Sequence, residues 1–205
     1  TLTSNSGEIW AIFLAPLIGL PIPLLPVHIL WINLVTDGLP GLALSSEIEE
    51  KDIMKRPPRH PRENIFAGGL GLHVLWIGLL MGAATIGVQA WAIHVGDPRW
   101  QTMAFNVLCL SQMGHVLAIR SESRSLFSIG LFSNKPLLGA VLLTFALQMA
   151  VTYVPFLQPI FNTEALTLME LVIVMVVSSI VFIAVELEKL FFRVRRKHGS
   201  VSTQL

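Results

Sequence analysis

The hydrophobic residues of this chain lie in long, nearly uninterrupted blocks, without the two- or 3.6-residue alternation of an element that faces water on one side. A helix of about 20 residues crosses a hydrocarbon core roughly 30 Å thick, and several blocks reach that length. The pattern therefore predicts an all-α polytopic membrane protein, a six-transmembrane-helix bundle lying in a lipid bilayer. The six predicted helices cover residues 5–20, 26–44, 66–94, 101–119, 135–154 and 167–192.

The polar segments between the blocks divide the chain further. A Gly-Leu-Pro-Ile-Pro turn at 19–23 is too short for a soluble loop, so the first two helices must be neighbours. The longest polar stretch, 45–65, contains Pro57, Pro58 and Pro61, which exclude a continuous helix there. The first block barely reaches the length of a span, and its polar residues fall at one end. We expect the chain to begin partway along a longer helix.

Composition and charge support the membrane prediction and give it an orientation. The chain is 53% hydrophobic and 13% charged, against roughly a quarter charged in a soluble domain. Of the 14 Lys and Arg residues, 13 fall in the 45–65 loop, the 120–135 connection and the tail from 189 onward, which all lie on one side of a six-helix arrangement. The positive-inside bias places that side in the cytoplasm. A net charge of +1 gives no reason to expect a nucleic-acid partner.

Two acidic residues lie inside the predicted spans, where a charge costs about 2.5–3.5 kcal/mol on insertion scales and usually marks a functional site. Glu8 is 12 residues before Leu20, about 18 Å at the helical rise. Asp37 is 11 residues after Pro26, about 17 Å by the same rise. Both carboxylates are therefore predicted near the middle of the membrane, on adjacent helices.

Neutral oxygen donors accompany the two carboxylates. Asn5 precedes Glu8 by three residues, and Asn33 and Thr36 precede Asp37 by four and one, so each set can share a helix face. Carboxylate and amide oxygens suit a hard cation such as calcium, whereas soft metals prefer Cys and His. The alternative is a hydrogen bond between Glu8 and Asp37 across a helix interface, with one or both protonated.

Two further positions bear on this candidate site. Pro40 lacks the N–H that would bond to the Thr36 carbonyl, so we expect the second helix to be broken there, with carbonyls free to face an ion. Gln112 lies 12 residues after Trp100, at a similar depth on the fourth helix. Its amide could be a ligand or could bond only to a neighbouring helix.

The run Leu-Trp-Ile-Asn-Leu-Val-Thr-Asp-Gly-Leu-Pro at 30–40 resembles the sixth transmembrane helix of type II P-type ATPases, and most nearly the calcium pumps of the sarcoplasmic-reticulum type. Ser-Asn-Ser-Gly-Glu at 4–8 resembles that family's fifth helix. Asp-Ile-Met at 52–54 and Arg-Pro-Pro-Arg at 56–59 resemble the loop that follows. The rest of the chain matches in spacing and hydropathy, so the resemblance covers the family's last six helices.

The resemblance implies that Asn5, Glu8, Asn33, Thr36 and Asp37 are ligands of a transported Ca²⁺. Gln112 departs from the pattern, because the sarcoplasmic-reticulum pumps have a glutamate there, and this favours one ion per cycle. The resemblance also implies that the chain has four parts: an ion-binding helix pair (1–44, its first helix truncated), a cytoplasmic loop (45–65), a four-helix supporting domain (66–192) and a cytoplasmic tail (193–205).

The resemblance further implies partners that this sequence does not contain. The family's phosphorylated Asp-Lys-Thr-Gly-Thr motif does not occur here, so we expect no ATP hydrolysis by this chain alone, with ATP and Mg²⁺ bound by absent cytoplasmic domains. Those domains and the first four helices of the same pump would be its partners. The alternatives are a non-catalytic truncated membrane module, or a pump for manganese or sodium. The expected location is a bacterial inner membrane.

Overall fold

The computed structural model describes residues 1–45, 47, 69–121, 126 and 130–201. For 192–201 it describes only the backbone. The loop motifs at 52–54 and 56–59, and the basic residues of that loop, lie outside the described residues, as does Arg124.

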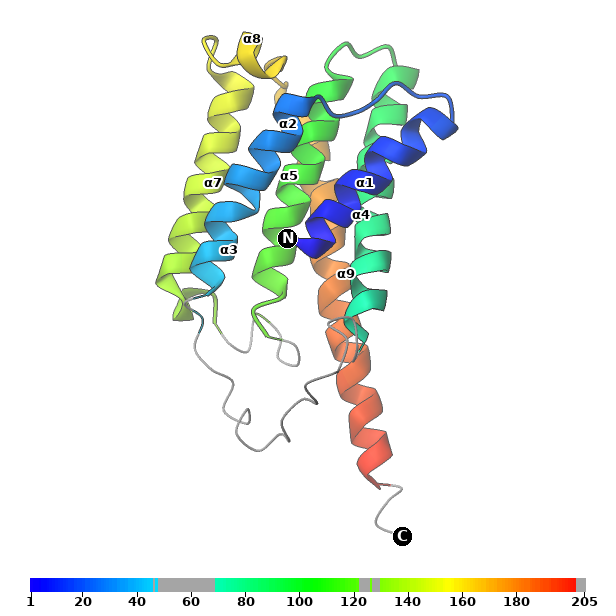
Figure 1. Cartoon of the computed structure of the whole chain (residues 1–205), viewed down its shortest axis with the longest axis vertical. Helices are drawn as coiled ribbons and strands as arrows, with labels where there is room; N and C mark the ends of the chain where they lie inside the picture. Colours follow the sequence, from blue (N-terminus) through cyan, green and yellow to red (C-terminus); the bar gives the residue numbers. More distant parts are fainter. Residues whose placement is uncertain (46, 48–68, 122–125, 127–129, 202–205) are drawn as a thin grey trace.

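The described chain is all-α, as predicted (Figure 1). Its elements are α1 (Leu2–Leu17), α2 (Pro26–Trp31), the π-helical η1 (Ile32–Thr36), α3 (Gly38–Leu44), α4 (Leu70–His94), α5 (Trp100–Ala118), the 3₁₀ turn η4 (Leu131–Ser133), α7 (Lys135–Tyr153), α8 (Gln158–Phe161) and α9 (Leu168–Val201). Helix α9 continues past the predicted end at 192, because no proline follows and lysine and arginine are good helix formers.

Four helical stretches in the described part of the chain are long and apolar enough to cross a membrane: Pro26–Leu44, Leu70–His94, Lys135–Tyr153 and Leu168–Phe191. The predicted count was six. Two of the predicted spans do not meet this length and hydropathy: α1 has only 16 residues, and α5 has 19 but carries many polar side chains. Large apolar side chains on the outer faces of α7 and α9, such as Leu142 and Ile180, are exposed and can face lipid.

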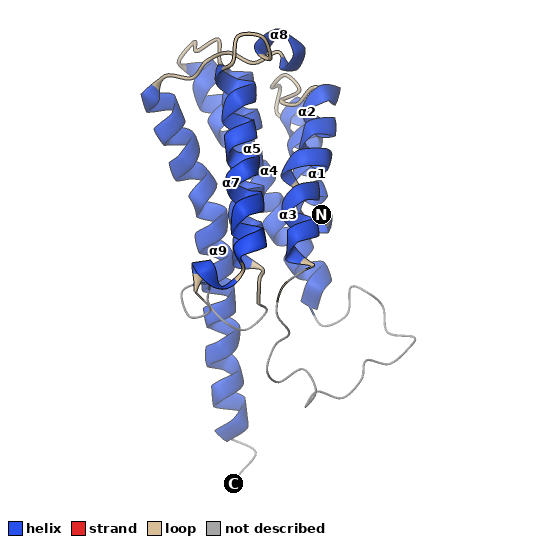
Figure 2. Cartoon of the chain, turned by 90° about the vertical axis from the view of Figure 1, so that its left-hand side faces the viewer, coloured by secondary structure: helices blue, strands red, loops and turns tan. Residues whose placement is uncertain are grey.

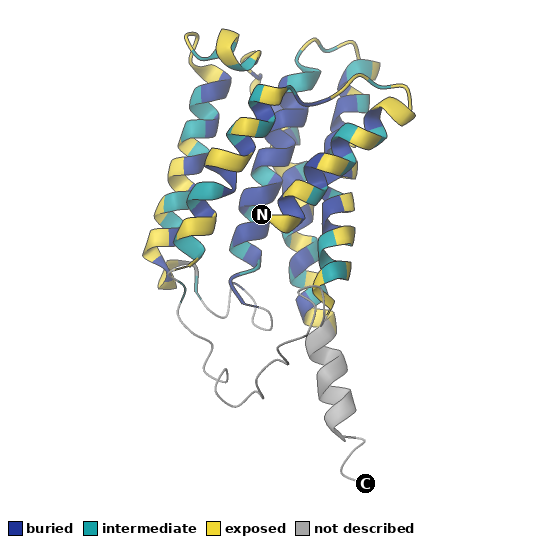
Figure 3. Cartoon of the chain, viewed as in Figure 1, coloured by how far each residue is buried: buried dark blue, intermediate teal, exposed yellow. Residues whose placement is uncertain are grey.

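Helix α5 is polar because it occupies the interior of the bundle. It packs against α4, α7 and α9, and most of its side chains are buried, as Figure 3 shows. Asn106 donates to Thr152 Oγ1 of α7 at 3.1 Å, and Gln148 Nε2 of α7 donates to Asn106 Oδ1 at 3.2 Å. The same Gln148 accepts from Trp31 Nε1 at 2.8 Å. An interior helix can thus pair polar side chains such as Asn106 with its neighbours and needs no apolar surface.

The second predicted helix is broken, as expected, and the break is a π turn. Residues Ile32–Thr36 form η1, closed by a bond from the Asp37 N–H to the Ile32 carbonyl at 2.9 Å. Helix α3 then starts at Gly38, and the Gly41 N–H bonds to the Asp37 carbonyl. The widened turn lies just before Pro40, which removes one donor from the helical ladder.

Glycines allow α1 to lie directly on α4. A Cβ at Gly78 would meet the Ser6 side chain, and one at Gly82 would lie 2.7 Å from Trp10 Cβ and 3.1 Å from the Ala11 nitrogen. Small residues spaced four apart are a common means of close helix approach in membranes. Helix α3 instead packs mainly on α7, so the first two predicted helices have separate supports.

Successive connections lie at opposite ends of the bundle (Figures 1 and 2). Residues 18–25, 95–99 and 154–167 lie at the end that holds α8, and α9 extends beyond the other end. At the α9 end, Arg120 donates to Glu47 Oε1 and Oε2 at 2.8 and 2.9 Å, and Asn134 Nδ2 donates to Glu47 at 2.8 Å. These hydrogen bonds, with that from Arg120 the larger cause, hold the pKa of Glu47 below its usual value.

Candidate cation site

Glu8 lies on the buried face of α1 and is 5% exposed. The buried positions of this helix are mostly small, namely Thr3, Ser4, Gly7, Ala11 and Ala15, and they recur at helical spacing around Glu8. The glutamate is therefore the one large side chain on a face that packs closely against α4 and also contacts α5. Its Oε1 has no hydrogen-bond partner among the described residues.

Asp37 follows the π turn and is 2% exposed. Neither carboxylate oxygen has a hydrogen-bond partner within the described part of the chain. The Asp37 carboxylate lies near the start of α1, beside Ser4 and 3.9 Å from the amino group of Thr1. In a polypeptide that continues upstream, an uncharged amide would replace that amino group. Asp37 and Glu8 are close enough to interact electrostatically.

The remaining predicted residues lie differently around the two carboxylates. Asn33 Nδ2 donates to Glu8 Oε2 at 3.4 Å and to the Ile29 carbonyl at 2.9 Å, and its side chain is otherwise exposed. Gln112 is fully buried on α5 and faces the Glu8 carboxylate, but neither of its amide atoms reaches hydrogen-bond geometry with any described residue. The structure thus brings Asn33, Gln112, Glu8 and Asp37 together from three segments.

Thr36 and Asn5 occupy the edges of this cluster. The Thr36 hydroxyl is buried and points at Cys109 Sγ of α5, 3.7 Å away. Asn5 is exposed on α1, outside the arc that buries Glu8, and no contact with the other predicted residues is present in the described structure. Ser4, which sequence reasoning did not select, lies beside Asp37. Its spacing of four residues before Glu8 was the signal that could have found it.

The unpaired oxygens define what the cluster can do. Of the buried side-chain oxygens that lack a hydrogen-bond partner in the described residues, five belong to this cluster: the Ser4 hydroxyl, Glu8 Oε1, both oxygens of Asp37 and Gln112 Oε1. Buried polar groups without partners are rare and costly, and more so at membrane depth. A hard cation would satisfy them, because calcium takes six to eight oxygens from carboxylates, amides, carbonyls and water. Within the described residues no group of three or more His, Cys, Asp or Glu side chains gathers to suit a softer metal.

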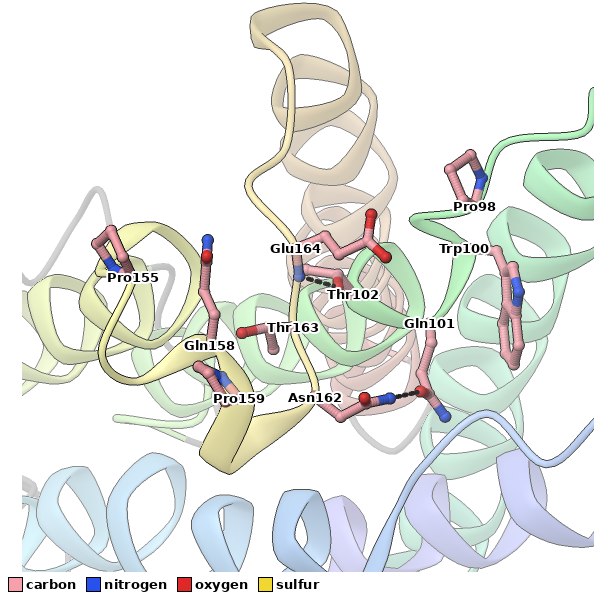
Figure 4. Close-up of a pocket in the computed structure, with 10 residues that line it drawn as sticks. All are labelled: Pro98, Trp100, Gln101, Thr102, Pro155, Gln158, Pro159, Asn162, Thr163 and Glu164. Atoms are coloured by element: carbon pink, nitrogen blue, oxygen red, sulfur yellow. Dashed lines mark hydrogen bonds between the residues drawn. The ribbon is translucent and has the colours of Figure 1, made fainter.

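A separate polar cavity of about 440 Å³ lies at the α8 end of the bundle, away from these carboxylates (Figure 4). Its polar groups are partly paired with each other: Asn162 Nδ2 donates to Gln101 Oε1 at 2.9 Å, and the Glu164 N–H donates to Thr102 Oγ1 at 2.9 Å. Glu164 is its only carboxylate. The cavity therefore offers a cation less charge than the pair on α1 and η1.

Four helices of membrane-spanning length and hydropathy, with a buried pair of carboxylates among the helices, indicate the class of protein: a multi-pass integral membrane protein. Residues 21–191 match the family model described as "Cation transporting ATPase, C-terminus", which covers most of the chain. The chain belongs to this family, and the resemblance to P-type ATPases found in the sequence is confirmed.

Three curated relatives are consistent with this family assignment. A "Calcium-transporting ATPase" of Bacillus subtilis is 47% identical over 182 residues, covering 87% of this chain and 20% of the relative. "Calcium-transporting ATPase 1" of Bacillus cereus is 37% identical, covering 92% of this chain and 23% of that protein. "Calcium-transporting ATPase 1" of Yarrowia lipolytica is 36% identical, covering 95% and 21%. The chain therefore spans about a fifth of the length of the relatives it matches.

Proposed function

We propose that the chain is the transport part of an ATP-driven calcium pump that exports calcium from the cytoplasm. The ion lies between α1 and the α2–η1–α3 helix, and α5 closes the site. Glu8 and Asp37 supply the charge, and Asn33, Thr36 and Gln112 supply neutral oxygens. Asn5, one turn before Glu8, stays in the proposed set on the family resemblance alone.

The observation that carries this proposal is the set of unpaired oxygens. Three of the four oxygens of two carboxylates at close range, and both amide atoms of the fully buried Gln112, have no hydrogen-bond partner among the described residues. One bound cation would neutralise most of the buried charge and coordinate the free oxygens. With two carboxylates and one glutamine, the site favours one calcium ion per cycle.

The membrane arrangement is part of the same proposal. We take α1 and α5 as spans in addition to the four long apolar helices, which makes six crossings with a broken second helix. Helix α5 is shielded by its neighbours, and α1 packs along α4. The basic end, where α9 leaves the bundle, faces the cytoplasm of a bacterial cell. The remaining helices and the ATP- and Mg²⁺-binding domains would belong to the other four-fifths of the protein.

Transport requires that the ion bind more tightly in one state than in the other. In the proposed cycle, phosphorylation in the cytoplasmic domains moves α1 relative to α3. The separation of Glu8 from Asp37 then lowers the affinity for the ion on the outward side. The separate supports of α1 and α3, on α4 and α7, allow such a movement without breaking either packed pair.

The test is ATP hydrolysis by the full-length protein in lipid, titrated with calcium, manganese, magnesium and sodium. It compares wild type with Asp37→Asn and with a matched control, Asp97→Asn. Asp97 lies in the α4–α5 connection and pairs with Arg99, so the control makes the same chemical change outside the site. We expect stimulation by micromolar calcium in wild type and Asp97→Asn, and none in Asp37→Asn.

Other outcomes distinguish the alternatives. Stimulation by manganese or sodium with the same loss in Asp37→Asn would keep the site and change the ion. Full calcium-dependent activity in Asp37→Asn would refute the site. Absence of any ion-dependent hydrolysis in wild type would favour a non-catalytic membrane module.

A further inference from the structure

A second group of titratable side chains lies outside the proposed cation site, between α4, α5 and α9. His73 Nδ1 lies 2.6 Å from Glu188 Oε2, and His73 Nε2 lies 3.3 Å from His115 Nε2. Trp76 Nε1 donates to the other oxygen of Glu188 at 3.1 Å. The three titratable residues lie 42 or more positions apart in the sequence, so the fold alone brings them together.

The two imidazole rings meet tip to tip. Their centroids are 5.6 Å apart, while the two Nε2 atoms are 3.3 Å apart, and the difference is about the diameter of one imidazole ring. The nitrogen lone pairs therefore point at each other along one line, which suits a single N–H···N hydrogen bond. Two ligands of one metal ion would instead converge at a tetrahedral angle. The geometry thus favours a proton over a metal between His73 and His115.

Counting hydrogens shows how many protons this group holds. With Glu188 ionised and both histidines neutral, His73 donates through Nδ1 to Glu188 and accepts at Nε2 from His115, and the net charge is −1. Adding one proton makes His73 an imidazolium that donates to Glu188 and to His115, which changes tautomer. The net charge becomes zero, and every hydrogen bond is kept. The Glu188–His73 and His73–His115 hydrogen bonds are therefore kept whether or not the group holds the additional proton.

We propose that Glu188, His73 and His115 form a proton-binding triad that takes up one proton and thereby strengthens the packing of α4 and α5 on α9. Access is partial: the His73 and Glu188 side chains are 19% and 17% exposed, whereas His115 is 3% exposed. The proton enters at His73 and is shared with the buried histidine. None of the three triad residues is among the proposed calcium ligands.

Other charged groups near the triad have partners of their own. On α9, Lys189 pairs with Glu186 at 2.6 Å and donates to the Ala118 carbonyl, and the end of α5 carries Arg120, which binds Glu47. On α1, which packs against α4, the charged groups are the amino group of Thr1 and the carboxylate of Glu8. Glu188 is therefore the anion in direct contact with His73.

The experiment measures the thermal midpoint of the full-length protein in nanodiscs between about pH 5 and pH 8, where histidine titrates. It compares wild type with Glu188→Gln, which keeps an oxygen for His73 and Trp76 but removes the charge. We expect the stability advantage of wild type to grow as the pH falls, because protonated His73 then loses its counter-ion only in the variant. A one-proton difference changes the unfolding equilibrium by at most tenfold per pH unit.

Two further variants make the outcome decisive. Glu164→Gln, at the opposite end of the bundle, should follow the wild-type profile. His73→Gln should lose the same pH-dependent component as Glu188→Gln, and the double variant should lose no more, because one proton belongs to both residues. Profiles of wild type and Glu188→Gln that run parallel at all pH values would show a static hydrogen-bond network and overturn the proposal. None of these readouts depends on calcium.

Discussion

Gly82 offers a sharp test of how closely α1 must lie on α4. A Cβ at this position would be 2.7 Å from Trp10 Cβ and 3.1 Å from the Ala11 nitrogen, where ordinary contact begins at 3.4 Å. Rotating a side chain cannot relieve this clash, because the atoms belong to the base of Trp10 and to the backbone. Gly82→Ala therefore has to push α1 outward by about 0.7 Å, at a cost of about 1–3 kcal/mol for overpacking.

The displacement should also reach the proposed cation site, because Glu8 lies less than one turn before the contact. If about 1.4 kcal/mol of the strain is relieved only when the ion is absent, the apparent calcium affinity falls about tenfold. We would measure the thermal midpoint and the calcium dependence of ATP hydrolysis in the full-length protein.

Gly87→Ala, on the same helix as Gly82, is the matched control, because its Cβ would meet no atom within 4 Å. We expect this variant to keep both the wild-type stability and the wild-type calcium affinity. Equal behaviour of Gly82→Ala and Gly87→Ala would refute the close α1–α4 contact. A loss of stability in Gly82→Ala with unchanged calcium dependence would separate the contact from the ion site.

Two other predictions concern pairs far from this contact. Because Arg120 holds the pKa of Glu47 below its ordinary value of 4.5, the pair stabilises the fold above about pH 4.5, and this stabilisation is lost as the pH falls through the lowered pKa. The stability of Glu47→Gln should thus approach that of wild type in acid, and a constant difference would contradict this. Gln148→Leu should cost roughly 0.6–1.7 kcal/mol per lost bond, since Trp31 and Asn106 both lose a partner. Equal thermal midpoints for Gln148→Leu and wild type would contradict this expectation.

The sequence was sufficient to predict the helices, because hydropathy blocks need no tertiary information. The depth of the two carboxylates in the membrane stays a prediction. Asn106 and Gln148 bond to each other between α5 and α7, a pairing that hydropathy alone does not reveal. The break in the second helix followed from Pro40, but its form did not. A π turn changes the angle between successive side chains, and no local residue preference reveals that change.

Other features depended on packing that the sequence does not contain. Asn5 shares a helical spacing with Glu8, yet the buried arc of α1 stops short of it, because α4 and α5 cover only part of the helix. Hydropathy underrates α5, since a helix surrounded by protein is free to be polar. His115 is buried on α5. Its pairing with His73 is a long-range contact that spacing cannot predict.

The separate supports of α1 and α3 have a mechanical consequence. Glu8 is held mainly through α4 and Asp37 mainly through α7, and the 18–25 connection links α1 to α2 at one end. Helix α1 and the α2–η1–α3 helix can therefore pivot about that connection, and the two carboxylates lie partway along them. Moving these two helices together brings the carboxylates of Glu8 and Asp37 closer, so their repulsion opposes closure unless a cation lies between them. The transported cation would then itself hold the two helices in the closed arrangement.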